Sequence, residues 1–126
     1  MEELLVFFIG ASGYGLLEIL WRGYTHWTML VVGGICYLAL YKMFGYLENT
    51  PAAVKALIGG LVITTAELVA GMILNVRLGM NVWDYSNLPF NLYGQICLIY
   101  SLLWAFLSMP LIYISKLVKK FVEKFA

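Results

Sequence analysis

The chain has 126 residues, of which 63% are hydrophobic and only 12% are charged. A soluble domain of this size has too little interior to bury so many apolar side chains, so the composition excludes an ordinary water-soluble fold and indicates a membrane protein. The formal net charge of +1 provides no basic field for nucleic acid, so the expected partners are the lipid bilayer, other helices and small molecules.

Four apolar runs have the length that an α-helix needs to span a bilayer, about 20 residues. They cover residues 4–21, 27–44, 52–76 and 92–114. The connections between them are short, so the sequence predicts a single all-α transmembrane domain over residues 1–126, an integral membrane four-helix bundle. The start of the chain is acidic rather than basic, so we expect the first run to be retained as a helix and not removed as a signal peptide.

The basic residues are unevenly distributed between the two ends of the predicted bundle. The end that holds both termini carries six lysines, which are Lys42, Lys55, Lys116, Lys119, Lys120 and Lys124. The other end carries Arg22 and Arg77. By the positive-inside rule, this multi-pass protein lies in the cell membrane with its N- and C-termini in the cytoplasm.

The last residues, 115–126, place Leu117, Phe121 and Phe125 at helical intervals among lysines. This pattern predicts an amphipathic extension that lies on anionic lipid, and a helix that docks on a partner is the alternative.

Small residues recur four apart at Ala52, Ala56 and Gly60 at the start of the third run. In a bilayer, helices associate mainly through close packing, and rows of small residues let their backbones approach. The pattern predicts tight packing of the third helix, and it also allows a face for self-association.

Two carboxylates fall within the predicted spans, Glu18 and Glu67. An ionised group inside the bilayer costs about 2.5 to 3.5 kcal/mol on insertion scales, so each one requires an explanation. Glu18 lies four residues before Arg22, on the same helix face, where an ion pair can form. Glu67 has no cationic residue within one turn of its own helix. It is either a ligand or proton acceptor, or a carboxylate that is hydrogen-bonded to neighbouring helices and fixes their register.

Other polar side chains near the outer ends of the spans can converge on Glu67, and the amides of Asn91 and Gln95 are four residues apart. The sequence therefore predicts an outward-facing pocket. Its expected ligand-binding residues are Glu18, Arg22, His26, Glu67, Arg77, Asp84, Asn91 and Gln95. Trp83, Tyr85 and Pro89 are expected to shape the loop beside it.

The pattern assigns no catalytic residue, no metal site and no cofactor. The acidic residues and His26 do not form a close ligand motif, and no serine or cysteine nucleophile lies beside a histidine. The chain also has no ATP-binding motif, so ATP-driven activity requires a separate ATPase in trans. Four helices alone would form a narrow pathway, so we expect a homo-oligomer or a larger membrane partner.

At WDYSNLPFNLYGQICL the chain resembles the small membrane proteins of the Putative ABC-transporter type IV, or CmpB-like, family. The matching residues are Trp83, Asp84, Tyr85, Pro89, Phe90, Asn91, Leu92, Gly94, Ile96, Cys97 and Leu98, preceded by the pairs Glu67 with Gly71 and Arg22 with Gly23. One departure is YTHWTMLVVGG, which stands where many members carry a proline-rich segment. The resemblance implies the four-helix membrane fold and a permease-like role.

Three functions are consistent with these patterns. The first is a permease, or a permease component, that binds a polar or charged solute or a lipid headgroup in the pocket. The second is a membrane-embedded enzyme that acts on a lipid or isoprenoid substrate through Glu18, Glu67 and His26. The third is a non-catalytic regulatory subunit whose polar cluster only locks the helices together.

Overall fold

The structure is a computed structural model that describes residues 2–125. Met1 and Ala126, the first and last residues of the predicted domain, lie outside this range. The four long helices are α1 (Glu2–Arg22), α2 (Trp27–Tyr46), α3 (Ala52–Gly71) and α4 (Leu98–Phe125). All four are long and apolar enough to span a membrane, which confirms the predicted all-α membrane fold.

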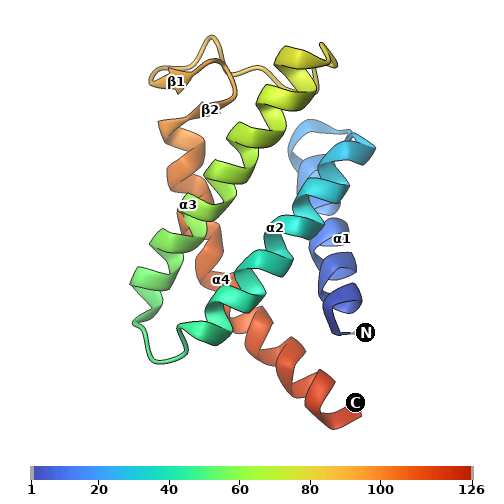
Figure 1. Cartoon of the computed structure of the whole chain (residues 1–126), viewed down its shortest axis with the longest axis vertical. Coiled ribbons are helices and arrows are strands. Elements are labelled where there is room, and N and C mark those ends of the chain that lie inside the picture. The colour runs from blue at the N-terminus through green and yellow to red at the C-terminus, as the bar shows by residue number, and fades with distance from the viewer. Residues whose placement is uncertain (1, 126) are drawn as a thin grey trace.

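The helices form two closely packed pairs, α1 with α2 and α3 with α4 (Figure 1). The pairs meet mainly through α2 and α3, so α1 and α4 flank the space between them. The start of α1 and the end of α4 lie at the same end of the bundle, while the loop before α4 lies at the other end (Figure 1).

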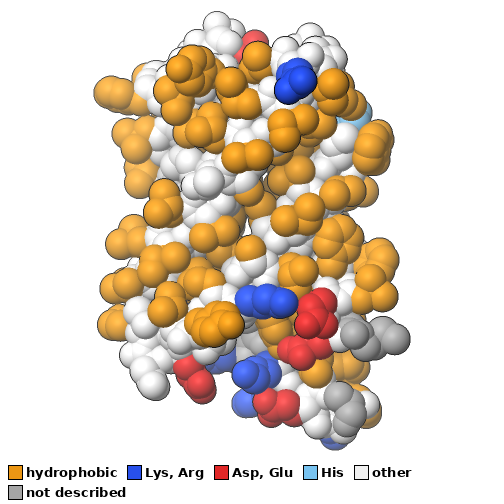
Figure 2. All heavy atoms as spheres, in the orientation of Figure 1, with side chains coloured by type: hydrophobic (Ala, Val, Ile, Leu, Met, Phe, Trp, Pro, Cys, Tyr) orange, Lys and Arg blue, Asp and Glu red, His pale blue; other side chains and the backbone are white. Residues whose placement is uncertain are grey.

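The outer surface of the bundle matches a lipid environment. Large apolar side chains are exposed on different helices, including Leu20, Leu57 and Phe106 at 76%, 65% and 73%. Figure 2 shows that hydrophobic side chains cover the middle of the visible face and that charged side chains gather at the end that holds the termini. In water such apolar patches would drive association, whereas in a bilayer they face lipid.

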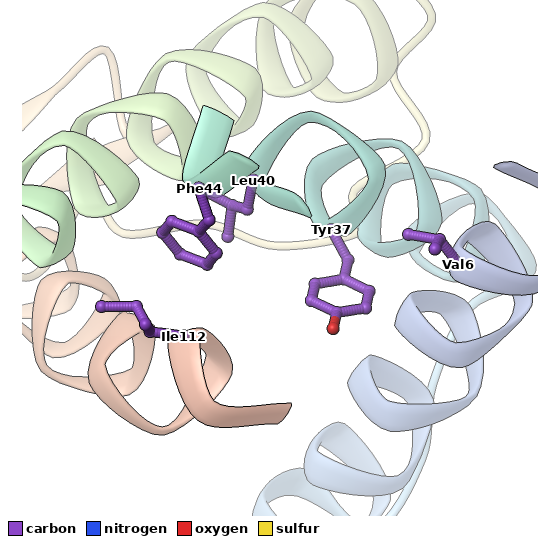
Figure 3. Close-up of a cluster of buried hydrophobic side chains, with 5 residues drawn as sticks. All are labelled: Val6, Tyr37, Leu40, Phe44 and Ile112. Atoms are coloured by element: carbon purple, nitrogen blue, oxygen red, sulfur yellow. The ribbon is translucent and has the colours of Figure 1, made fainter. Parts of the chain in front are cut away.

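The main hydrophobic core lies toward the terminal end. Val6 of α1, Tyr37, Leu40 and Phe44 of α2, and Ile112 of α4 form it (Figure 3). The Tyr37 hydroxyl is also hydrogen-bonded to the Ser115 hydroxyl at 3.0 Å, so its polar atom is satisfied inside the core. This packing joins the two helix pairs at the end away from the loop that precedes α4.

The fourth helix begins at Leu98, not at Leu92 as the sequence pattern predicted. Strands β1 (Asn91–Leu92) and β2 (Ile96–Cys97) form a short antiparallel hairpin before it. Tyr93 and Gly94 at its turn have φ values of 55° and 71°, in the left-handed region that a helix does not use. The Asn91 side chain accepts a hydrogen bond from the Gly94 N–H at 3.1 Å, an interaction that competes with helix formation.

The third helix continues beyond α3 as a π-helical segment, η1 (Met72–Arg77). It therefore ends at Arg77, one position beyond the predicted span 52–76. A π-helical turn is wider than an α-helical turn and changes the direction of the side chains that follow. Here it precedes the polar loop that carries Trp83, Asp84 and Tyr85.

The α3–α4 contact gives a test of the packing. A Cβ added at Gly60 would lie 2.8 Å from the Ala105 Cα and 2.9 Å from its backbone nitrogen, and backbone atoms cannot rotate away. We expect Gly60→Ala to lower the free energy of unfolding by about 1 to 3 kcal/mol through overpacking. Unfolding in detergent micelles, followed by circular dichroism, measures this loss.

The matched control is Gly45→Ala in α2, where an added Cβ meets nothing within 4 Å. It should unfold like the wild type. Equal losses in the two variants would contradict the close α3–α4 approach.

Candidate functional site

A cavity of about 840 Å³ lies at the end of the bundle away from the termini. Its walls come from the last turns of α1, from α3 and from the first turns of α4, and the loop at residues 81–88 forms its rim. Four of the predicted ligand-binding residues line it together, namely Glu18, Arg22, Glu67 and Asp84.

Glu67 is the most deeply placed charged group of this cavity. Its side chain comes from the last two turns of α3 and the residue is only 5% exposed. The Tyr85 hydroxyl donates a hydrogen bond to one carboxylate oxygen at 3.0 Å, and the Trp104 indole N–H donates to the other at 3.4 Å. Among residues 2–125, no ion pair reaches Glu67. The carboxylate is therefore held by neutral donors from the loop and from α4.

Glu18 is paired within α1, as its spacing from Arg22 predicted. The Arg22 guanidinium lies 3.6 Å from a Glu18 oxygen, and the Glu18 residue is 8% exposed. The Tyr14 hydroxyl donates to the same carboxylate at 2.9 Å and the Thr25 hydroxyl at 2.7 Å. Two hydrogen-bond donors and one ion-pair partner from the chain itself thus satisfy Glu18.

Arg22 also connects α1 to the loop that forms the rim of the cavity. Its guanidinium donates to the Val82 carbonyl at 3.1 Å and to the Tyr24 hydroxyl at 2.8 Å, and it lies 4.6 Å from the centre of the Tyr24 ring. These contacts hold the loop against the end of α1.

The hairpin before α4 is anchored to η1 through Gln95. The Asn75 amide donates to the Gln95 side-chain oxygen at 2.8 Å, and the Asn75 oxygen accepts from the Val82 N–H at 2.7 Å. The Trp83 indole donates to the Gln95 carbonyl at 2.9 Å. Gly71 permits this arrangement, because a Cβ there would lie 2.5 Å from the Gln95 side-chain oxygen.

Aromatic rings flank Glu67 on two sides. The rings of Tyr85 and Tyr100 are stacked, with their centroids 4.9 Å apart. The ring centroids of Tyr14 and Trp104 are 6.3 Å apart. Burial and the neighbouring Glu67 carboxylate raise the pKa of Tyr85, so its hydroxyl keeps the proton that it donates. Glu67 therefore lies in an aromatic environment with few polar contacts.

Asp84 occupies the exposed rim of the cavity. It accepts hydrogen bonds from both the backbone N–H and the hydroxyl of Ser86, with the N–H at 2.9 Å. These two donors lower the pKa of the Asp84 carboxyl, so it stays ionised at neutral pH. Gly94 packs behind this turn, and its carbonyl accepts from the Tyr85 N–H at 2.7 Å.

The other four predicted ligand-binding residues do not line the cavity. His26 is the N-cap of α2, where its Nδ1 accepts from the Thr28 N–H at 3.3 Å. Arg77 is exposed at the end of η1. Asn91 holds the hairpin and Gln95 holds the loop, so their spacing of four residues does not reflect a shared helix face.

The predicted loop residues also separate into two groups. Trp83 and Tyr85 line the cavity, and Pro89 does not. The sequence pattern missed Tyr14, Tyr100 and Trp104. Tyr14 lies one turn before Glu18, a spacing that could have identified it. Tyr100 and Trp104 lie one turn apart inside an apolar run, where aromatic residues have no distinctive signal.

The described part of the chain contains no group of three His, Cys, Asp or Glu side chains that could hold a metal ion. Cys36 and Cys97 are buried free thiols on separate elements.

The fold and the cavity define a small multi-pass membrane protein with a cavity at one end of its bundle that carries Glu18, Arg22, Glu67 and Asp84. The chain belongs to the Putative ABC-transporter type IV family, whose model matches residues 5–126, nearly the whole chain. The family description relates it to ABC transporters and thus to membrane transport. No curated protein and no solved structure matches the chain.

The Gln95 anchor gives a prediction for the loop. Gln95→Leu removes the acceptor for the Asn75 amide, and a buried donor without a partner costs about 1 to 3 kcal/mol. We expect a loss of stability in that range and altered fluorescence of Trp83, whose indole donates to the backbone of residue 95. Thermal unfolding in detergent, followed by tryptophan emission, measures both.

Asn49→Leu makes a similar change at an exposed position at the opposite end of the bundle. It should leave the unfolding midpoint and the emission spectrum as they are in the wild type. If Gln95→Leu behaved in the same way, the hairpin would not depend on Gln95.

Proposed function

We propose that this protein is a small permease, or a permease component, that binds a polar or charged solute or a lipid headgroup in the cavity beside Glu67 and takes part in its movement. The observation that supports the proposal is the environment of the Glu67 side chain. Its carboxylate is buried in a spanning helix, lines a cavity of about 840 Å³ and has no ion pair among the described residues. Such a group is costly in a bilayer and is typical of a binding or transport site.

The distribution of charge supports an outward orientation for the cavity. The six lysines belong to α2, α3 and α4 and lie toward the end of the bundle that holds the termini, whereas the cavity lies at the other end. By the positive-inside rule, the terminal end would face the cytoplasm and the cavity would face outward. A solute would then reach Glu67 past the rim residue Asp84.

The apolar lining between Glu67 and the terminal end suggests that this chain needs a partner to move a solute across the membrane. Toward the termini, the next cavity is lined mainly by apolar side chains such as Val32, Leu40 and Leu111. A charged solute would meet a high barrier there. A second copy of the chain or a larger membrane protein would complete the pathway, and a separate ATPase would supply energy if the process uses ATP.

Solute binding tests the proposal directly. Purified protein in detergent is titrated with ethylammonium chloride, sodium acetate and potassium phosphate by calorimetry. We expect saturable binding of at least one of them and a change of at least about tenfold in its affinity in Glu67→Gln, which for the ammonium ion is a loss, because removing one partner of a buried charge pair costs about 2 to 5 kcal/mol. Glutamine keeps the shape of the side chain and one oxygen acceptor, so one of the two donors, Tyr85 or Trp104, keeps its partner.

Glu48→Gln is the matched control, since Glu48 is exposed in the α2–α3 connection and lies outside the cavity. It should bind like the wild type. In vesicles that contain the protein and any co-purifying partner, uptake of the bound solute should also disappear in Glu67→Gln. Equal binding and uptake in wild type and Glu67→Gln would exclude the proposal.

One observation also favours the regulatory alternative. The cluster around Glu67, Tyr85 and Trp104 connects α3, α4 and the loop, as a purely structural lock would. In that case Glu67→Gln would lower the thermal unfolding midpoint without any effect on binding, and a defined partner would co-purify. The enzyme alternative gains no comparable support, because His26 caps α2 and does not line the cavity with Glu18 and Glu67.

A further inference from the structure

A second, apolar cavity adjoins the cavity described above. It has a volume of about 380 Å³ and lies between α1 and α4 along α2, toward the terminal end of the bundle. The two cavities share Tyr14, Glu67 and Trp104 in their walls. They therefore meet at Glu67, as an upper part that carries the charged side chains and an apolar lower part.

The upper part has the chemistry of a cation site. Glu18 is neutralised by Arg22, whereas no ion pair reaches Glu67 or Asp84 in the described part of the chain, so the carboxylates that line the cavity outnumber its basic groups. The rings of Tyr85 and Tyr100 line the same space. A carboxylate among aromatic faces is the arrangement that attracts an organic ammonium group, through Coulomb and cation–π interactions.

The lower part has the chemistry of a hydrocarbon site, and it lies within the spanning helices. Gly13 of α1 leaves open space, since a Cβ there would meet nothing within 4 Å. Leu107 and Leu111 of α4 line the opposite side, and Leu17, which lines both cavities, is 50% exposed toward the surrounding lipid. A hydrocarbon chain in this groove would remain in apolar surroundings while its head lay at Glu67.

We propose that the ligand is a lipid-like amphiphile from the bilayer, with an ammonium head beside Glu67 and a hydrocarbon chain in the groove between α1 and α4. This inference rests on the proposed function, because it names the ligand class of the same site. The meeting of the two cavities at Glu67 and the excess of carboxylates over basic groups together favour this occupant over a free anion or a soluble anionic solute.

Photo-crosslinking in nanodiscs tests the ligand class. The nanodiscs are made of phosphatidylglycerol and contain a trace of phosphatidylethanolamine with a diazirine in the middle of one acyl chain. The matched probe is phosphatidylglycerol with the same diazirine chain. We expect the ammonium-headed probe to label peptides of α1 and α4 around Gly13 and Leu107 about tenfold more than the anionic probe does.

Two variants separate the head from the chain. Glu67→Gln should lower labelling by the ammonium-headed probe to the level of the anionic probe. Gly13→Phe should also lower it, because it adds a ring to the wall of the groove at a position where an added Cβ meets nothing within 4 Å. Circular dichroism and elution volume confirm that both variants are folded, and Glu48→Gln should be labelled like the wild type.

The outcomes distinguish the two proposals. Equal labelling by both probes, or labelling outside the α1–α4 groove, overturns the proposal that the ligand is an ammonium-headed amphiphile. If soluble ethylammonium still binds in a Glu67-dependent manner, the proposed function survives that failure. If neither ethylammonium, the other soluble ions nor the lipid probe depends on Glu67, both proposals fail.

Discussion

The hydrogen bonds to the Glu67 carboxylate are the constraint on which the polar end of this structure depends. A carboxylate in the middle of a spanning helix must be satisfied, because lipid offers no hydrogen-bond donors. Tyr85 and Trp104 supply these donors from the loop and from α4. Tyr85 can reach Glu67 only if the loop folds back over the bundle. The Gln95 anchor and the contact between Arg22 and the Val82 carbonyl hold the loop in that position.

The two ends of the bundle are built differently. At the terminal end, Val6, Leu40, Phe44 and Ile112 join the two helix pairs through a dense apolar core. At the other end the pairs diverge around the cavity, and a smaller apolar cluster of Met29, Val82 and Trp83 lies beside the polar contacts of the loop. Within the described residues, no buried side-chain nitrogen or oxygen lacks a hydrogen-bond partner. The polar end is therefore fully satisfied by the chain, although the charge on Glu67 has no counter-ion there.

The sequence predicted the membrane fold because span length and hydropathy follow directly from bilayer thickness. It also predicted the Glu18–Arg22 pair, which depends only on helical spacing. The prediction that the fourth helix starts at residue 92 was wrong. Asn91 and Gly94 form a local turn within a run that hydropathy alone assigns to a helix. Trp104 could not be found, since its contact with Glu67 depends on how α3 packs against α4. His26 caps α2 through the Thr28 N–H, two residues along the chain, so its place is set locally and not by tertiary packing.

The central claim is that Glu67 contacts a ligand that enters the cavity. Difference infrared spectroscopy observes this carboxylate directly when ethylammonium is added to the protein in nanodiscs. The account predicts a shift in a carboxyl band that appears in the wild type and in Glu48→Gln and is absent in Glu67→Gln. A spectrum without any change in the wild type, or the same change in Glu67→Gln, would contradict it.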